Sequence, residues 1–352
     1  MNGETKYYQK IIKQNSNFEP IQLGYFKLIT DNFELQINKI KSRVNNFVKD
    51  YWDIIDENIF CEINSIYDIL KINLNNIKLF YIRYHKKTKS IYVILNHCNV
   101  GGGDYLLLGA VMFNGSANSL FKNDKSYINK IKYSIYKSQF IYTIFNNLYN
   151  KYPRERYNHE KIIYSQINEI NKFHIIYTIL TNIINSTNNT DKLTCLIPIG
   201  FENNKGNDIG IILFTFYKNT LYTQFKKKLK KLKNLAFGSK LLLNSKINNF
   251  NIFYDIETKF KKNIDVVITL GNIINNDIQL DICTSGMYYK MNNDFSYPYY
   301  VWGLSINNKT HVTYSVSDKL CDIDKLSYMA HGNDITNKYI YKLNIHQIQS
   351  NI

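Results

Sequence analysis

The sequence IYVILNHCNVGGGDYLLL, from Ile91 to Leu108, decides how the rest of the chain is interpreted. Its first part is a run of β-branched, aromatic and aliphatic residues, which is typical of a buried strand. His97 follows at the end of this strand, and the glycines from Gly101 to Gly103 separate it from a second apolar run. Glycines leave open space and bare backbone N–H groups beside a side chain. The stretch therefore favours a general base placed next to a substrate channel.

The segments on either side of this stretch also have clear periods. Residues 33–52 carry apolar side chains at steps of three and four, which predicts a helix. Residues 77–84 and 91–95 alternate and are joined by the polar loop at 86–89, which predicts a β-hairpin. After the glycines, residues 105–113 predict a buried helix that stops at an Asn-Gly pair.

The second half of the chain shows the same mixture of helical and strand patterns. In order, they predict a helix at 160–184, strands at 194–201 and 209–217, a lysine-rich helix at 225–235, strands at 264–270 and 278–283, a hairpin at 299–306 and 310–316, and a helix at 324–330. The polar segment around Pro153 is the candidate linker, which predicts domains at 1–155 and 156–352. The expected fold class is α/β, with two sandwiches side by side, each a mixed sheet flanked by helices.

The composition limits the partners that the chain is expected to bind. The 352 residues include 44 Lys and Arg against 28 Asp and Glu, a formal net charge of +16. Arginine, which most often reads nucleic acid, is scarce among the basic residues, and no zinc-finger, RNP or helix-turn-helix pattern is present. We therefore expect no nucleic-acid partner and attribute the charge to a lysine-rich composition. A polyanion-binding surface is the alternative.

Cysteine usage and hydropathy bound the compartment. The cysteines are far apart and odd in number: Cys61, Cys98, Cys195, Cys283 and Cys321. No pair has CxxC spacing, so neither a disulfide framework nor a metal site is indicated. The N-terminus is polar, and no stretch reaches the roughly 18 apolar residues of a membrane span. We expect a cytoplasmic protein that holds no metal.

Three parts of the sequence, in order along the chain, form a larger pattern. The first is the strand and glycine loop at 91–103, and the second is a strand–loop–strand at 196–210. The third combines 265–269 with 302–306 and 312–318. Together they resemble the chloramphenicol acetyltransferase-like superfamily of CoA-dependent acyltransferases, which includes wax ester synthase/diacylglycerol acyltransferases and peptide-synthetase condensation domains. The first part is similar to the family's strand and HHxxxDG loop.

The resemblance implies an architecture and a mechanism. An N-terminal lobe would carry His97, and a C-terminal lobe would complete a tunnel at the interface of the two. His97 would act as general base on a hydroxyl acceptor, such as a lipid or long-chain alcohol, as it attacks the thioester of acyl-CoA. The developing oxyanion would accept hydrogen bonds from the N–H groups of Gly101 and Gly102 or from the Thr269 hydroxyl. No permanently bound cofactor is implied, because acyl-CoA is a co-substrate.

The sequence departs from the family pattern at two positions of the loop. Asn96 stands where the family has its first histidine, and Gly101 stands where it has a structural Asp. Asp104, three residues later, is the candidate to replace that Asp structurally, and a helix N-cap before Tyr105 is the alternative. The missing Asp also favours a second hypothesis, a catalytically inactive member of the fold that serves as a binding or scaffolding module.

Other histidines, one cysteine and the lysine-rich helix leave further alternatives. His97 itself is open to a simpler interpretation, a satisfied histidine at a strand end, and His311 and His331 are interpreted as packing residues. Cys98 adjoins His97, but adjacent strand residues point to opposite faces, which disfavours a Cys-His pair. The helix at 225–235 places its apolar residues on one stripe and lysines elsewhere. It is either a domain helix with a solvated basic face, a surface for anionic lipid, or a contact for CoA phosphates.

Overall fold

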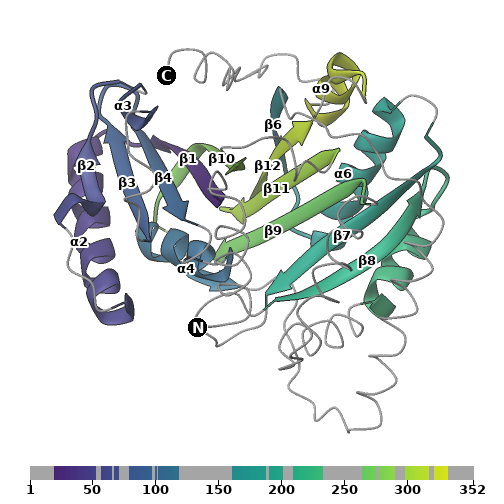
Figure 1. The fold of residues 1–352 in the computed structure, drawn as a ribbon, viewed down its shortest axis with the longest axis horizontal. Helices are drawn as coiled ribbons and strands as arrows, with labels where there is room; N and C mark the ends of the chain where they lie inside the picture. Colours follow the sequence, from purple (N-terminus) through teal and green to yellow (C-terminus); the bar gives the residue numbers. More distant parts are fainter. Residues whose placement is uncertain are drawn as a thin grey trace, which may run out of the picture.

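The computed structural model describes residues 20–52, 57–65, 67–70, 79–96, 100, 102–118, 161–187, 190–200, 209–232, 264–274, 277–289, 298–316 and 321–331. These residues form two mixed β-sheets with helices between them and on their outer faces (Figure 1). None of the helices in these ranges combines the length and the apolar character needed to cross a bilayer.

The first sheet has the strand order β10-β1-β4-β3-β2. Its strands are β1 (Pro20–Ile29), β2 (Phe60–Glu62), β3 (Phe80–His85), β4 (Ser90–Asn96) and β10 (Gln279–Tyr289). Neighbours are antiparallel except for β2 and β3. The helices on this side of the molecule are α2 (Phe33–Trp52), the single turn η1 (Glu57–Ile59), α3 (Tyr67–Leu70) and α4 (Gly102–Met112).

The second sheet has the order β6-β12-β11-β9-β7-β8, and β5 pairs with β9 beside this path. Its strands are β5 (Ser116–Asn118), β6 (Lys161–Ile167), β7 (Lys192–Gly200), β8 (Ile209–Tyr217), β9 (Val266–Ile274), β11 (Tyr299–Ile306) and β12 (Lys309–Val316). Parallel pairing of β9 with both β7 and β11 makes this sheet mixed. Helices α6 (Lys172–Ser186), α9 (Ile323–His331) and a helix at 222–232 pack on its outer face.

The predicted fold class is confirmed, and several predicted elements have the observed bounds. Helix α2, strand β8 and strand β11 match the predicted residues at both ends. The β11–β12 hairpin turns at Asn307 and Asn308, whose φ angles of 52° and 62° lie in the left-handed region. Asparagine tolerates this region better than other non-glycine residues, so the turn follows from local sequence.

The helix predicted at 160–184 is wrong in its first part. Residues 161–167 form strand β6, which pairs antiparallel with β12, and the helix there is α6. The Asn171 side chain caps α6 by accepting the Phe173 N–H at 3.1 Å. Residues 161–167 contain apolar side chains that fit either period, and the open edge of β12 decided the outcome.

Strand β1 was not predicted, although it lies between β10 and β4 in the first sheet. Glycine weakens a strand pattern, and Gly24 lies in its interior. The structure explains this glycine, because a Cβ there would overlap the hydroxyl of Tyr105 and lie 3.1 Å from its Cζ. Tyr105 is only 6% exposed, so its ring has little room to move.

Replacing Gly24 with alanine is therefore expected to destabilise the protein by about 1–3 kcal/mol, the usual cost of overpacking. The same change made together with Tyr105→Phe should cost less, because the overlapping hydroxyl is gone. Urea unfolding of both single variants and the double variant measures this coupling. Equal costs of Gly24→Ala in the two backgrounds would contradict the proposed contact.

Each sheet contains a strand from the other half of the chain. β10 follows β9 in sequence but pairs with β1, with Cys283 opposite Phe26. β5 precedes the second half but pairs with β9, with Ala117 opposite Ile273. The division at residues 155 and 156 stays a prediction, and the two sheets are tied together by this exchange of strands.

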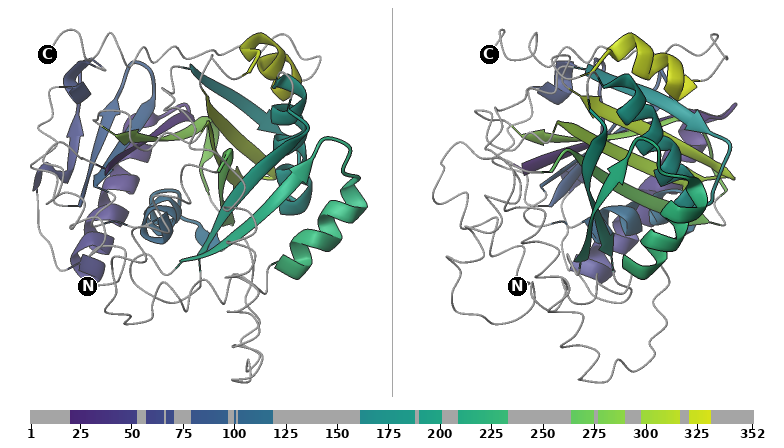
Figure 2. Two further views of the ribbon diagram at one scale, coloured as in Figure 1. Left: turned by 45° about the vertical axis from the view of Figure 1, so that its right-hand side comes forward. Right: turned by 90° about the vertical axis from the view of Figure 1, so that its right-hand side faces the viewer.

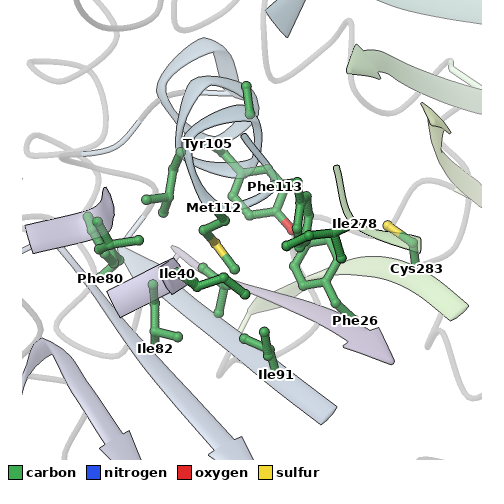
Figure 3. Packing of buried hydrophobic residues seen from close by; sticks show 14 of the residues in the cluster. Phe26, Ile40, Phe80, Ile82, Ile91, Tyr105, Met112, Phe113, Ile278 and Cys283 are labelled. Atoms are coloured by element: carbon green, nitrogen blue, oxygen red, sulfur yellow. The ribbon is translucent and has the colours of Figure 1, made fainter. Parts of the chain in front are cut away.

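Helix α4 lies between the two sheets, as the left view of Figure 2 shows. Its residues belong to one hydrophobic cluster that also includes Phe26 of the first sheet and Trp302 of the second. The rings of Phe26 and Phe113 meet edge to face, with centroids 5.1 Å apart (Figure 3). Because α4 contributes to a core shared by both sheets, the start of this helix is held at their junction.

Candidate active site at the junction of the two sheets

The end of β4 and the start of α4 enclose the loop that contains His97. Asn96 ends β4, and its N–H donates to the Leu79 carbonyl at 2.8 Å. Its carbonyl accepts the N–H of Val100 at 2.9 Å, and Val100 is fully buried. His97 and Gly101 lie outside the described residues, so the structure places the ends of this loop and not its side chains.

Contacts between α4 and β9 set the level at which the helix begins. A Cβ on Gly109 would lie 3.2 Å from Ile273 Cδ1, and one on Gly271 would lie 2.7 Å from Leu106 Cδ1. Moving back along both elements, these contacts pass from residue 109 to 106 and from 273 to 271. Because α4 and β9 run side by side in this direction, we expect one further step to bring the first turn of α4 to the level of Thr269.

Thr269 also points to the correct side of β9. Alternate residues of a strand share a face, so the Thr269 side chain lies on the same face as Gly271, the face that contacts α4. Gly102 begins α4, and only its backbone is described. The structure therefore brings together two oxyanion candidates that the sequence singled out separately, the backbone at the start of α4 and the Thr269 hydroxyl.

Two aromatic residues of β11 adjoin Thr269. The Tyr300 hydroxyl donates to Thr269 Oγ1 at 3.5 Å. Trp302 lies opposite Thr269 in the β11–β9 pairing, and its ring centroid is 6.3 Å from that of Tyr105. Burial raises the pKa of Tyr300, so its phenol stays protonated and remains a donor.

Asp104 connects the start of α4 to the end of α2. It is 3% exposed, and its Oδ1 accepts the Tyr51 hydroxyl at 3.0 Å. Burial, and then the negative charge of Asp104, raise the pKa of Tyr51, so this phenol donates at neutral pH. Because α4 begins at Gly102, Asp104 lies within its first turn and does not precede the helix as an N-cap. A carboxylate in this turn also interacts favourably with the helix dipole.

We expect Asp104→Ala to lower the free energy of unfolding by about 2 kcal/mol, because it removes a charge-assisted hydrogen bond from a buried place. Tyr51→Phe should cost less, since it leaves the carboxylate in place. In a double-mutant cycle followed by urea unfolding, the Tyr51 change should add little once Asp104 is already alanine. Additive losses would mean that the two side chains do not act on each other.

A second buried polar cluster lies where β10 meets β6 and β12. His311, which is 2% exposed, has Nδ1 2.7 Å from the Tyr164 hydroxyl. The Gln166 amide donates to that hydroxyl at 2.8 Å and to the Asp281 carbonyl at 2.7 Å. The pairing register shifts between Lys27 and Leu28 opposite Asp281, so the bulge leaves this carbonyl for side chains to bond. His311 is thus a packed histidine that joins the two sheets.

The lysine-rich helix contacts the second sheet through its apolar stripe. Phe225 and Leu229 are each 1% exposed, and Leu232 packs against the same cluster. The prediction that this stripe lies on lipid is therefore wrong for these residues, because the stripe is part of the protein's own core. The exposed residues of the helix include Lys227, Lys230 and Lys231. Residues 233–235 of the predicted helix lie outside the described residues.

Comparison with known proteins gives a fold and no sequence family. No family model matches the sequence, and neither does any curated protein. Solved structures do match, over 94% of this chain. They include polyketide synthase associated protein 5 from Mycobacterium tuberculosis (TM-score 0.55, 8% identity, 96% of that chain) and the EpoB NRPS cyclization-docking bidomain from Sorangium cellulosum (0.55, 6%, 82%). The chain has the condensation-domain fold.

A third match concerns a protein solved with a thioester. The starter condensation domain of rhizomide synthetase RzmA, in complex with C8-CoA, is similar to this chain with a TM-score of 0.54 and 7% identity, covering 94% of this chain and 91% of that one. At such identities the likeness establishes the condensation-domain fold alone. The roles of His97, Gly101, Gly102, Thr269, Asp104 and Asn96 therefore stay predictions.

Sequence reasoning missed the aromatic residues around the site. Tyr51, Tyr300 and Trp302 gave no signal, because the chain has 30 tyrosines and no motif marks these three. Pairing between β9 and β11 is what brings Tyr300 and Trp302 beside Thr269. Among the residues that the structure describes, no cluster of three His, Cys, Asp or Glu side chains is placed to hold a metal ion.

Proposed function

We propose that this protein is an acyltransferase that moves an acyl group from acyl-CoA, or another acyl thioester, to a hydroxyl acceptor. The observation that carries the proposal is the junction itself. The loop with His97 runs from the end of β4 to the start of α4, and the face of β9 with Thr269 lies alongside that helix. A general base, backbone N–H groups and a hydroxyl donor are the groups that acyl transfer needs.

In the proposed reaction, neutral His97 removes the proton of the acceptor hydroxyl as its oxygen attacks the thioester carbonyl carbon. The carbonyl oxygen becomes an oxyanion, stabilised by the N–H groups of Gly101 and Gly102 or by the Thr269 hydroxyl. One such donor contributes roughly 3–4 kcal/mol in other enzymes. Collapse of the intermediate breaks the C–S bond, and the imidazolium returns its proton to the departing thiolate. The products are an ester and free CoA.

Two further contacts support a site that is held in place without the family's loop Asp. Tyr51 bonds Asp104 in the first turn of α4, so this helix start is fixed from α2. Tyr300 bonds Thr269, which limits the rotation of that hydroxyl. We assign Asp104 and Tyr300 as positioning residues, because each acts through a group expected to contact the reactants.

A thiol-release assay with C8-CoA and a panel of alcohols, including long-chain alcohols and a diacylglycerol, tests the proposal. We expect CoA release that depends on the acceptor and equals the amount of ester formed. Release without any acceptor dependence would mean hydrolysis and would overturn the transfer step. Folded protein that neither binds C8-CoA nor releases CoA would favour the catalytically inactive binding module, the hypothesis that Gly101 motivates.

A further inference from the structure

A basic ridge runs along the helix at 222–232, on the side away from the core. We define the basic ridge as Tyr217, Leu221, Lys227, Lys228 and Lys231. Leu221, Lys228 and Lys231 are spaced at i, i+7 and i+10, so they follow one line along the helix, and Lys227 adjoins it. The Lys228 ammonium lies 6.0 Å from the centre of the Tyr217 ring, which joins the end of β8 to this line.

The ridge exposes apolar side chains that the core does not use. Leu221 is 61% exposed and Tyr217 is 53% exposed, although both adjoin a well-packed helix. The N–H of Phe225 donates to the Leu221 carbonyl at 3.0 Å, so the backbone of Leu221 is fixed by the first helical turn. Phe225 itself is 1% exposed. Leu221 and Tyr217 therefore lie at the surface while the true apolar stripe remains in the core.

The charge of this segment has a single sign. Residues 209–232 contain six lysines and no aspartate or glutamate. The exposed helix α2 provides a comparison within the same chain, because its lysines and arginine share the helix with Glu34 and Asp50. The lysine-rich composition of the whole chain accounts for a mixed surface such as that of α2. It does not account for an unmixed one beside exposed leucine and tyrosine.

We propose that the basic ridge binds the surface of an anionic lipid bilayer. Lysine ammonium groups are attracted to anionic headgroups, and leucine and tyrosine side chains enter the interfacial region. Nucleic acid fits less well, since the ridge contains no arginine and Leu221 has no counterpart in a phosphate backbone. Binding leaves Phe225 and Leu229 in the core and is independent of the proposed acyl transfer.

Sedimentation with vesicles of phosphatidylcholine, with and without 30% phosphatidylserine, tests the proposal on the full chain. Lys227→Gln with Lys231→Gln should lower partitioning onto the anionic vesicles by roughly 25-fold, about fivefold per lysine. Leu221→Ser should lower it by roughly fivefold. The matched controls are in α2: Lys39→Gln with Lys41→Gln, and Leu35→Ser at a leucine that is 49% exposed. These controls should change partitioning by less than twofold.

Three outcomes would overturn the ridge as a lipid-binding surface. Equal binding to vesicles with and without phosphatidylserine would exclude recognition of anionic lipid. Equal losses in the ridge and α2 variants would mean that net charge alone drives binding. Loss of binding to a 30-nucleotide RNA in the ridge variant, with vesicle binding retained, would assign the ridge to nucleic acid. Because these assays involve no acyl-CoA, their result is separate from that of the thiol-release assay.

Discussion

Replacing His97 with alanine is expected to reduce acyl transfer from C8-CoA by two to four orders of magnitude. General-base catalysis typically contributes about 10²–10⁴-fold, and no other histidine of the described chain lies in the loop between β4 and α4. The loss should fall on kcat, because the imidazole acts on the proton that moves in the transition state. Initial rates of thiol release at saturating C8-CoA and acceptor measure it.

The neighbouring residue provides the control for this variant. Cys98→Ala changes the same loop and removes a potential nucleophile, so it should retain most of the wild-type rate if His97 is the base. The wild-type rate should also fall at low pH, as an imidazole of ordinary pKa near 6.5 becomes protonated. A His97→Ala variant that is folded and keeps more than a tenth of the rate would exclude His97 as the base. The thioester chemistry would then belong to another group.

The second large effect is a loss of stability at acid pH that depends on His311. Burial lowers the pKa of His311 from 6.5 to about 4, with the nearby charge of Lys309 adding to the effect and that of Asp281 opposing it. Between these pH values the unfolded chain binds a proton that the folded chain does not. The stabilisation is therefore complete above about pH 6.5 and is lost as the pH falls through 4. The shift corresponds to about 3 kcal/mol.

Urea unfolding at pH 7 and at pH 4.5, on the wild type and on His311→Asn, measures this contribution. Asparagine is neutral at both pH values, so the variant should lose the part of the pH dependence that belongs to the imidazole, whatever its stability at pH 7. An NMR titration of the imidazole gives the pKa directly. Titration of His311 near pH 6.5, or equal pH dependence in the two proteins, would show that burial does not hold this ring neutral.

Local sequence was sufficient for elements whose period had one interpretation. The apolar residues of α2 recur at helical steps, and each of them that is buried lies on one face. By contrast, residues 161–167 fit both a helix and a strand. They became β6 because β12 offers unpaired backbone groups along its edge. Pattern reasoning cannot see that edge, since β12 begins about 140 residues later in the chain.

The candidate site divides in the same way. The strand, histidine and glycine sequence from 91 to 103 points to a general base through its local pattern alone, because those residue types in that order have few other uses. Tyr51 could not be found in this way. It lies more than 50 residues from Asp104, and its role depends on how α2 packs beside α4.

By itself, the sequence determined the fold class, the helix α2, the turn at Asn307 and Asn308, and the choice of His97 as the residue to test. Each of these depends on side chains within a few turns or strand residues of one another. Only the tertiary structure decided that β10 joins β1, that Thr269 faces α4, and that Phe225 lies in the core rather than on lipid. Those outcomes depend on burial and strand pairing between distant residues, which no local period encodes.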